Sequence, residues 1–476
     1  MLAPFISELD KIAPSFPIHG SQVEILQTPA DFYDTLKAKV RSAKRRIFLS
    51  TLYIGKSERE LIVVLQEALR ANPDLTLHIL TDALRGTRES PRPSCASLLA
   101  PLVAEFGPER VDIRMYHTPN LTGLRKKYIP KRINEGWGLQ HMKLYGFDDE
   151  VMLSGANLST DYFTNRQDRY HLFRSKEITD FYWGLQSAVS SLSFRIDPSE
   201  SEAGYEKVWP AGNAAPSPLD SPKEFVSKAT ERVGQLIATT SRMQSSTDTH
   251  DTSIYPLVQM TQLLSPDAST ELPALTHVLK TLSLPEFSNS SWTFTAGYFN
   301  PAPSLTKLLL STASHHNVVI TASPFANGFY KSKGVSGMLP DAYTLLARNF
   351  LHDVHTRKKD LAITLKEWQR GTVNEPGGWT YHAKGLWVTL PSEANPSLSL
   401  VGSSNYTKRS YSLDLEANAM ILTSNEDLKT RLGDEQRRLQ EYAAPVTRDD
   451  FARTERRVSL KVRIAMWIVS LVGGAL

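Results

Sequence analysis

Cysteine is almost absent from this chain: Cys95 is the single cysteine among 476 residues. An intrachain disulfide is therefore impossible, which excludes the disulfide scaffolds of small secreted proteins. Cysteine-rich zinc sites are excluded for the same reason.

The chain also lacks a long apolar run. No stretch reaches the roughly 18 apolar residues of a spanning helix, and residues 1–20 have no features of a secretory signal or a transit peptide. The nearest candidate, residues 464–476, is short, contains a tryptophan and follows a cluster of arginines and lysines. This combination is typical of an interfacial anchor. We expect residues 446–476 to associate with a membrane; a buried core helix or a shortened span are the alternatives.

Neither sign of charge dominates. The formal net charge of +4 is small for this length, so composition does not indicate nucleic acid, and a mildly basic balance suits an anionic substrate or membrane surface. The length predicts two or three domains, or one large domain built from two halves.

One order of predicted elements occurs twice. In the first copy, a strand over 45–55, a helix over 58–71 and a strand over 75–88 precede a pair of short strands. In the second copy, strands over 291–301 and 317–334 flank a helix and precede the same paired-strand segment. Apolar residues at helical and strand spacing carry these predictions.

The repeat predicts an α/β protein of two α/β/α sandwich halves, related by a pseudo-twofold axis, with a cleft between them. We expect the halves at residues 1–196 and 256–445. Residues 197–255, rich in Ser and Pro, are predicted to form a partly mobile linker with one amphipathic helix.

Each copy contains a His-x-Lys pair: His141 with Lys143, and His382 with Lys384. Residues i and i+2 of a strand face the same side, so each His and Lys should point into the cleft together. A Gly-containing segment follows each pair and ends in an asparagine, Asn157 or Asn405. One His-x-Lys alone is more often an ordinary strand pair, but two with matching neighbours favour a functional site.

This set of residues suits phosphodiester chemistry. One neutral imidazole can attack phosphorus and form a phosphohistidine, and the second can protonate the leaving oxygen. Lysine and asparagine side chains can stabilise the charge that builds up on the phosphate oxygens. Asp168 and Glu416, each eleven residues after its asparagine, are predicted to orient the imidazoles. No carboxylate cluster stands near the motifs, so we expect no metal in the chemistry; a divalent cation that helps to bind substrate stays open.

The motifs resemble the phospholipase D superfamily, whose signature is His-x-Lys-x4-Asp followed by a Gly-containing Asn segment. The first copy, with Asp148, fits fully, and the resemblance places Asp148 among the catalytic residues. The second copy has Thr389 at the equivalent position, which leaves the role of that aspartate open. By the same resemblance, the N-terminal histidine, His141, is expected to be the nucleophile; the symmetry of the two copies leaves the reverse assignment open.

Residues 32–442 resemble more narrowly the mitochondrial phosphatidylglycerophosphate synthases of eukaryotes. That resemblance implies transfer of a phosphatidyl group from CDP-diacylglycerol to sn-glycerol 3-phosphate, on the pathway to cardiolipin, by a peripheral enzyme on the matrix side of the mitochondrial inner membrane. Arg85 and Arg88, and Lys331 and Lys333 in the matching loop, are candidate phosphate ligands. A further basic cluster could meet pyrophosphate or anionic lipid: Arg125, Lys126, Lys127, Lys131 and Arg132.

Three alternatives stay open. The first is a related enzyme with another acceptor, such as a phosphatidylserine synthase, a cardiolipin synthase or a phospholipase. The second is a nuclease or another phosphodiesterase, which the modest charge disfavours. The third is a lipid-binding protein without turnover, which the intact His, Lys and Asn residues disfavour.

Overall fold

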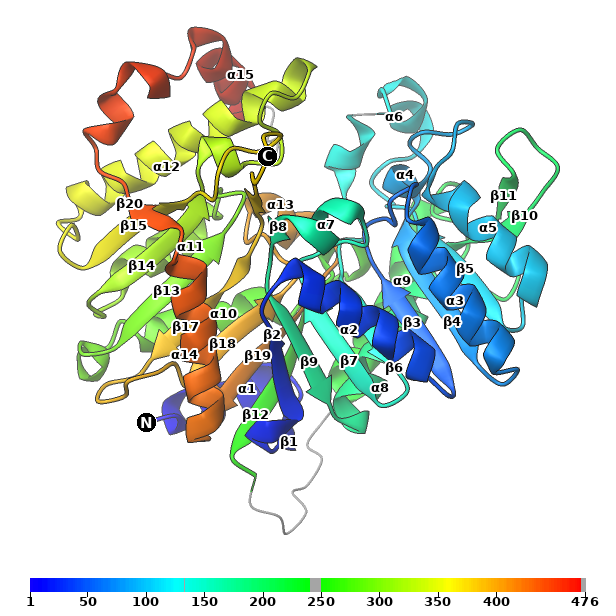
Figure 1. The fold of residues 1–476 in the computed structure, drawn as a ribbon, viewed down its shortest axis with the longest axis horizontal. Coiled ribbons are helices and arrows are strands. Elements are labelled where there is room, and N and C mark those ends of the chain that lie inside the picture. Colours follow the sequence, from blue (N-terminus) through cyan, green and yellow to red (C-terminus); the bar gives the residue numbers. More distant parts are fainter. Residues whose placement is uncertain (132, 240–249, 472–476) are drawn as a thin grey trace.

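The computed structural model describes residues 1–131, 133–239 and 250–471, and two large mixed sheets dominate it (Figure 1). The first sheet has nine strands, in the order β11 (Tyr205–Val208), β10 (Phe194–Pro198), β5 (Val111–Tyr116), β4 (Thr76–Asp82), β3 (Arg46–Ser50), β6 (Leu144–Phe147), β7 (Glu150–Ser154), β9 (Tyr170–Arg174) and β2 (Val23–Leu26). Its half of the molecule contains the helices α2 (Pro29–Ser42), α3 (Arg59–Ala71), α4 (Ala83–Gly86), α5 (Cys95–Phe106), α6 (Gly123–Tyr128), α7 (Thr160–Thr164), α8 (Lys176–Ser190) and α9 (Pro222–Thr239).

The second sheet also has nine strands. Their order is β1 (Phe16–Ile18), β12 (Thr252–Gln259), β19 (Glu416–Thr423), β18 (Leu398–Gly402), β17 (Lys384–Thr389), β13 (Ser291–Ala296), β14 (Asn317–Ala322), β15 (Ile363–Trp368) and β20 (Ala443–Pro445). The helices on this side are α1 (Ala3–Ile12), α10 (Glu271–Thr281), α11 (Pro303–Ser311), α12 (Leu339–Thr356), α13 (Lys408–Ser412), α14 (Glu426–Gln440) and α15 (Leu460–Leu471).

The two sheets repeat one topology. Strands β3, β4 and β5 are parallel neighbours, and β6, β7 and β9 continue the sheet in antiparallel pairs. Strands β13, β14 and β15, with β17, β18 and β19, repeat this arrangement. Because both faces of these strands are covered, their sequences are nearly continuous apolar runs. The predicted two-half α/β architecture is confirmed.

The first residues of the chain belong to the second half, which differs from the predicted first half at residues 1–196. Helix α1 packs on α10, and β1 pairs with β12, so residues 3–18 join the second half. The predicted linker also holds structure: β11 extends the first sheet, and α9 packs against α8. Part of the linker, residues 240–249, lies outside the described residues.

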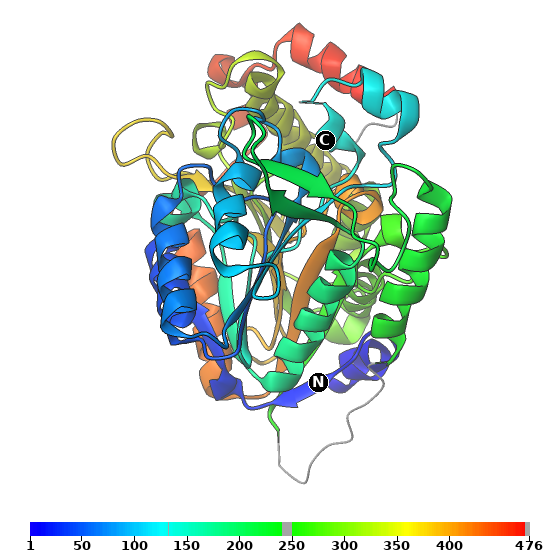
Figure 2. The same cartoon turned by 90° about the vertical axis from the view of Figure 1, so that its right-hand side faces the viewer.

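A shared apolar core joins the halves. It combines Phe48 and Met142 of the first half with Ile254, Trp387 and Leu415 of the second. Each half also has its own core beneath its outer helices. Turning the molecule by 90° shows the second half packed behind the first, with the N-terminal elements at the base (Figure 2).

The predicted membrane-associating segment contains α15, which packs on α12. Leu460 is 72% exposed and Ile464 is 49% exposed. The end of the segment, residues 472–476, lies outside the described residues. Across the described ranges, none of the helices has the length and apolar character needed to traverse a bilayer.

Candidate active site

The two histidines occupy equivalent places at the junction of the halves. His141 lies three residues before the start of β6, and its backbone N–H donates to the carbonyl of Leu415 in the other half at 2.9 Å. His382 lies two residues before Lys384, the first residue of β17, and its N–H donates to the carbonyl of Gln167 at 2.8 Å. Each histidine is therefore held in place by backbone from the opposite half.

Strand alternation decides which side chains enter the cleft. Met142 and Ala383, the middle residues of the two His-x-Lys motifs, are fully buried in the shared core. The flanking His and Lys side chains consequently point the other way. Small residues lie around them: a Cβ added at Gly155 would meet Lys384 Nζ at 2.4 Å and Asp168 at 2.7 Å. Glycine at this position leaves room for the charged groups.

Each imidazole contacts a carboxylate from the opposite half. His382 Nδ1 donates to Asp168 Oδ2 at 2.7 Å, and His141 Nδ1 lies 2.9 and 3.0 Å from the two carboxylate oxygens of Glu416. A proton on Nδ1 leaves the Nε2 lone pair available for attack or for proton transfer. In the sequence, Asp168 follows the first motif and Glu416 follows the second. In the structure, Asp168 contacts the histidine of the second motif and Glu416 that of the first.

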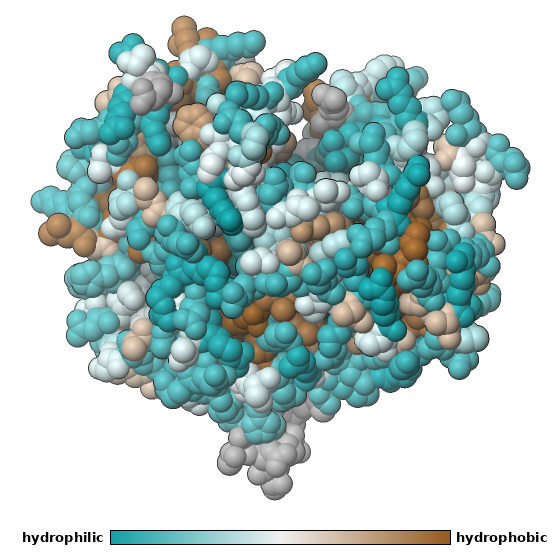
Figure 3. Space-filling view, viewed as in Figure 1, coloured by the Kyte–Doolittle hydropathy of each residue, from teal (hydrophilic) through white to brown (hydrophobic). Residues whose placement is uncertain are grey.

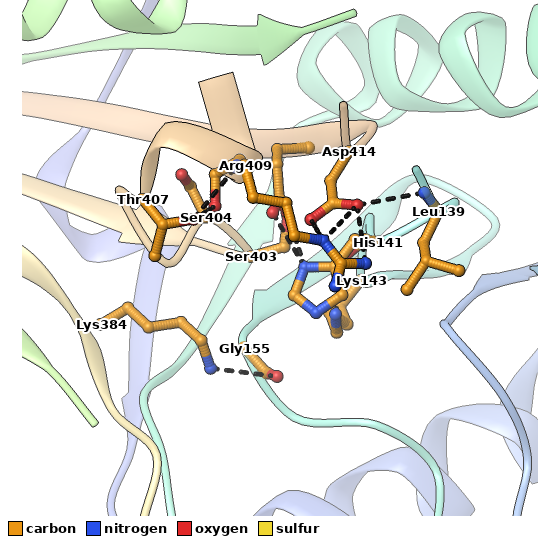
Figure 4. Close-up of polar contacts among 12 residues, drawn as sticks. Leu139, His141, Lys143, Gly155, Lys384, Ser403, Ser404, Thr407, Arg409 and Asp414 are labelled. Atoms are coloured by element: carbon orange, nitrogen blue, oxygen red, sulfur yellow. Dashed lines mark hydrogen bonds and ion pairs between the residues drawn. The ribbon is translucent and has the colours of Figure 1, made fainter. Parts of the chain in front are cut away.

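Both motif lysines are buried beside the histidines, but their partners differ: Lys384 pairs with a carboxylate, whereas Lys143 donates to a backbone carbonyl. Lys384 Nζ contacts Asp168 Oδ2 at 3.2 Å, the carbonyl of Gly155 at 3.4 Å and Nδ1 of His382 at 2.5 Å. Lys143 Nζ donates to the carbonyl of His141 at 2.7 Å. Figure 4 shows the amino group of Lys384, from the second half, directed toward the carbonyl of Gly155 in the first half. Cations from both halves thus converge on one place.

Burial and neighbouring charges set the protonation of the site. Burial, with the adjacent Lys143 and Lys384 ammonium groups, holds the pKa of both imidazoles well below the usual value. Burial also lowers the pKa of Lys143 to about 7, against the attraction of Glu416. A bound phosphate would replace the missing solvent with negative charge, and so favour the protonated forms of these groups.

The two carboxylates differ in their titration. Burial raises the pKa of Glu416 to about 7, although Lys143 and Ser403 oppose the rise. Burial would also raise the pKa of Asp168, but Lys384 and His382 hold it below the usual value. The His382 unit therefore has a firmly ionised partner, whereas Glu416 titrates near neutrality.

The asparagines are placed differently from each other. Asn157 is buried; its Nδ2 donates to the Tyr162 hydroxyl at 3.1 Å and its Oδ1 accepts from Thr51 at 3.3 Å. Asn405 is half-buried, and its Oδ1 is a buried atom with no hydrogen-bond partner among the described residues.

Aromatic rings surround His382, an environment that the motifs do not predict. The Tyr162 hydroxyl lies 3.5 Å from His382 Nε2, and the Tyr298 ring stands edge-on to the imidazole, with centroids 5.3 Å apart. Arg166 lies over the Tyr162 ring at 4.6 Å. Only the position of Tyr162 in the sequence could have indicated its role, because it follows Asn157 by five residues. It lies on α7, and α13 follows Asn405 in the same way in the second half.

A charged pair and a hydroxyl group stand near His141 instead. Arg409 on α13 bonds Asp414, which also accepts from the backbone N–H of Leu139 at 3.0 Å (Figure 4). Ser403 donates to Glu416. These contacts fix the loop before His141 and the carboxylate behind it, so the two histidines have different surroundings.

Asp148 lies outside the site, which corrects its predicted catalytic placement. Its carboxylate accepts from the backbone N–H groups of Lys44, Arg45 and Arg46 at 2.8, 2.7 and 3.1 Å. It stands in the turn after β6 with φ 51°, at the opposite end of the strand from Lys143. Five residues of strand span roughly 17 Å, so Asp148 anchors the start of β3 and does not touch the histidine. Thr389, at the same end of β17, is equally remote from the chemistry.

The predicted phosphate ligands are spread over separate loops. Arg85 lies over the Tyr53 ring at 4.0 Å, bonds Glu89 at 3.2 Å, and lines a hollow of about 260 Å³ together with Ser159 and Thr160. Arg88 pairs with Glu135 through two of its guanidinium nitrogens, Nε and Nη2.

The remaining predicted cations face solvent. Lys331 stands 3.7 Å from Glu375 with its side chain 62% exposed, and Lys333 is also exposed. The structure gives neither lysine a contact with the histidines within the described ranges. Of the basic cluster after residue 124, Arg132 lies outside the described residues.

Comparison with known proteins supplies a chemical context. The chain is 46% identical to the CDP-diacylglycerol–glycerol-3-phosphate 3-phosphatidyltransferase of Saccharomyces pastorianus, over 94% of this chain and 88% of that protein. It is 45% identical to the Saccharomyces cerevisiae enzyme of the same name, over 98% and 92%. The human mitochondrial enzyme of that name is 35% identical over 95% and 83%.

A solved structure shares the fold. The crystal structure of phosphatidylserine synthase from Haemophilus influenzae superposes with a TM-score of 0.75, covering 99% of this chain and 97% of that one, at 19% identity. No family model matches the sequence.

Proposed function

Because this chain belongs to the family of CDP-diacylglycerol–glycerol-3-phosphate 3-phosphatidyltransferases, we propose that it transfers the phosphatidyl group of CDP-diacylglycerol to glycerol 3-phosphate. The products are phosphatidylglycerophosphate and CMP. The observation that carries the proposal is the pair of imidazoles, each with its Nδ1 on a carboxylate of the opposite half. Such a pair supplies one nucleophile and one proton donor to a single phosphorus.

In the first step, Nε2 of His141 attacks the phosphorus that bears the diacylglycerol. The bond between this phosphorus and the bridging oxygen breaks, and His382 donates its Nε2 proton to the departing CMP. Glu416 holds the imidazole of His141 through Nδ1 and stabilises the positive charge that develops on the ring. A phosphatidyl-histidine remains on the protein.

In the second step, a hydroxyl of glycerol 3-phosphate attacks the same phosphorus. His382, now neutral, takes the hydroxyl proton, and the bond between phosphorus and His141 breaks. We assign Lys143, Lys384 and the amide N–H groups of Asn405 to stabilising the charge on the phosphoryl oxygens in both steps. The proposed chemistry uses no metal, and it leaves open a divalent cation that helps to bind the pyrophosphate.

We assign the acceptor phosphate to the hollow beside Arg85. Its guanidinium group lies over the Tyr53 ring at 4.0 Å, and Lys56, Ser159 and Thr160 line the same hollow. The carboxylates of Glu58, Glu89 and Asp161 also belong to the lining, and the Thr160 hydroxyl donates to Glu58 at 2.8 Å. A phosphate can replace Glu89 as the partner of Arg85, because a guanidinium fork binds both groups in the same way. Arg88 would support the loop, and Lys331 and Lys333 remain weaker candidates.

We also propose a peripheral position on the matrix side of the mitochondrial inner membrane. The animal relatives are named as mitochondrial. The substrate is a lipid, and the exposed Leu460 and Ile464 of the basic C-terminal segment suit an anionic membrane surface.

Acid quench with CDP-diacylglycerol labelled in its lipid part tests the histidine roles. We expect label on the wild-type protein and on His382→Ala, and none on His141→Ala. Label on His141→Ala but not on His382→Ala would reverse the two roles. A well-folded His382→Ala protein that carries no label would show that its acid function is needed before the intermediate forms.

Release of CMP with a panel of acceptors tests the substrate. We expect turnover with glycerol 3-phosphate and little with serine or water. Arg85→Ala should raise KM for glycerol 3-phosphate more than KM for CDP-diacylglycerol, and Lys333→Ala serves as an exposed control. A well-folded enzyme that prefers serine would instead favour a phosphatidylserine synthase, the activity of the protein that shares its fold.

A further inference from the structure

A large cavity lies apart from the histidines, between α12 and the C-terminal segment. Its volume is about 1430 Å³. Residues of α12 line one side, and residues between 448 and 463 line the other. None of the motif histidines, lysines or asparagines is part of the lining, so this is a second site.

Arginine dominates the charged lining of this cavity. Arg348 of α12 faces Arg448, Arg457 and Arg463 of the C-terminal segment, and Asp449 is the single carboxylate in the lining. Within the part of the chain that the structure describes, these four guanidinium groups make no ion pair. Like charges around one hollow repel one another, and an anionic ligand would relieve that repulsion.

Neighbouring arginines outside the cavity do have partners. Arg453 pairs with Asp450 at 2.8 Å, and Arg456 pairs with Glu367 at 2.6 Å. The carboxylates of Asp450 and Glu367 are therefore engaged by arginines that are not part of the cavity lining. The cavity lining therefore keeps an excess of positive charge, with four arginines and one aspartate.

The cavity also has an apolar part. Leu345, Phe451 and Val458 belong to its lining, as does Leu460, which is 72% exposed. One turn beyond Leu460, Ile464 is 49% exposed. A ligand that fits this surface has an anionic group beside hydrocarbon, which describes a phospholipid better than a soluble phosphate or a nucleic acid.

A second segment of the same character lies at the same end of the molecule. Figures 1 and 2 both place α6 and α15 at the end opposite the N-terminus. On α6, Leu124 and Tyr128 are 73% and 70% exposed, and Arg125 and Lys127 stand between them. Figure 3 shows hydrophobic residues exposed at the upper left, where Figure 1 places α15. Two separate basic and apolar segments at one end suit an extended planar partner.

We propose that the cavity between α12 and residues 448–463 binds the headgroup of an anionic phospholipid within a bilayer. The arginines hold the phosphate, and Leu460 and Ile464 enter the apolar edge of the membrane. The site lies outside the histidine cleft and rests on the peripheral membrane position proposed above, to which it adds a defined headgroup site; its test does not depend on turnover.

Flotation of the full chain with vesicles tests this site. Vesicles of phosphatidylcholine alone are compared with vesicles that also contain phosphatidylglycerol. The test variant is Arg348→Ala/Arg457→Ala/Arg463→Ala. The control, Lys44→Ala/Arg232→Ala/Lys280→Ala, removes the same charge from exposed residues elsewhere. Unfolding midpoints of both variants are compared with that of the wild type.

We expect the wild type to bind anionic vesicles and to bind neutral ones weakly. The cavity variant should lose about a hundredfold in affinity, since each cation near an anionic surface contributes about fivefold. The single variant Arg457→Ala should lose about fivefold and serves if the triple variant does not fold.

Three results would overturn the proposal. Equal losses in the cavity and control variants would indicate diffuse attraction without a headgroup site. Equal binding of wild type to neutral vesicles would remove the role of the phosphate. Release from vesicles by inorganic phosphate, at an ionic strength where chloride releases nothing, would indicate a site for a small soluble anion.

Discussion

His382 of the second half donates its Nδ1 proton to Asp168 of the first half, at 2.7 Å. The reciprocal contact joins His141 to Glu416 at 2.9 Å. Each half therefore completes the imidazole–carboxylate pair of the other. Moving the halves apart would break both pairs, so the site forms only when the halves are packed together.

Asp168→Asn tests the orienting role of that carboxylate. An amide cannot stabilise the imidazolium and favours the wrong tautomer, so kcat should fall about 10² to 10⁴-fold, with a smaller change in KM. The rate of CMP release measures the effect. Asp427→Asn, on α14 at a side chain that is 76% exposed, is the control and should leave kcat unchanged. Full activity of Asp168→Asn would remove Asp168 from the mechanism.

Asp148→Ala should weaken the fold and leave the chemistry unchanged. Three backbone N–H groups lose a charged acceptor, so the free energy of unfolding should fall by about 2 kcal/mol. Urea unfolding measures the loss, and kcat is measured on the folded protein. Asp149→Ala removes only an exposed partner of Arg45, and should cost less than about 0.5 kcal/mol. A large loss of kcat in a stable Asp148→Ala protein would return this residue to the active site.

Acidification should destabilise the protein through its buried imidazoles. Burial holds the pKa of His382 well below the usual 6.5 in the folded state, so below pH 6.5 the unfolded chain binds a proton that the folded chain does not. The free energy of unfolding then falls by up to about 1.4 kcal/mol per pH unit for this group. His382→Asn, which cannot titrate, should lose correspondingly less between pH 6.5 and about 5.5. Equal slopes for the two proteins, measured by urea unfolding, would contradict the prediction.

Arg169→Ala should weaken the packing of the two halves against each other and so lower the free energy of unfolding. This fully buried arginine bonds Glu435 at 2.9 and 2.8 Å and the Leu400 carbonyl at 2.6 Å across the interface. Its removal leaves Glu435 buried without its main partner, and should cost about 3 to 5 kcal/mol of unfolding free energy. Arg437→Ala breaks an exposed pair with Asp434 and should cost under about 1 kcal/mol. Losses of equal size would mean that burial of the Arg169 pair does not matter.

The repeated elements were predictable because they depend on local patterns. Apolar spacing predicted the helix over residues 58–71, and the structure has α3 at Arg59–Ala71. The amphipathic helix predicted within the linker is α9, Pro222–Thr239. The edge strands were not predictable: β1 is three residues long, and its partner β12 lies more than 200 residues away along the chain. Such pairing depends on which sheet edge is free, which local sequence does not encode.

The sequence by itself determined the chemical groups of the site and their pairing in the two copies. The period of a strand places His and Lys on one side at i and i+2, whatever surrounds them. Only the tertiary structure decided which carboxylate meets which imidazole, because Asp168 and Glu416 each cross to the opposite half. The tertiary structure also showed that Asp148 lies in a turn outside the site, because the end of β6 next to Asp148 is a strand length away from Lys143. Contacts between residues far apart in the chain follow from how the two halves pack, and that packing depends on the shared core as a whole.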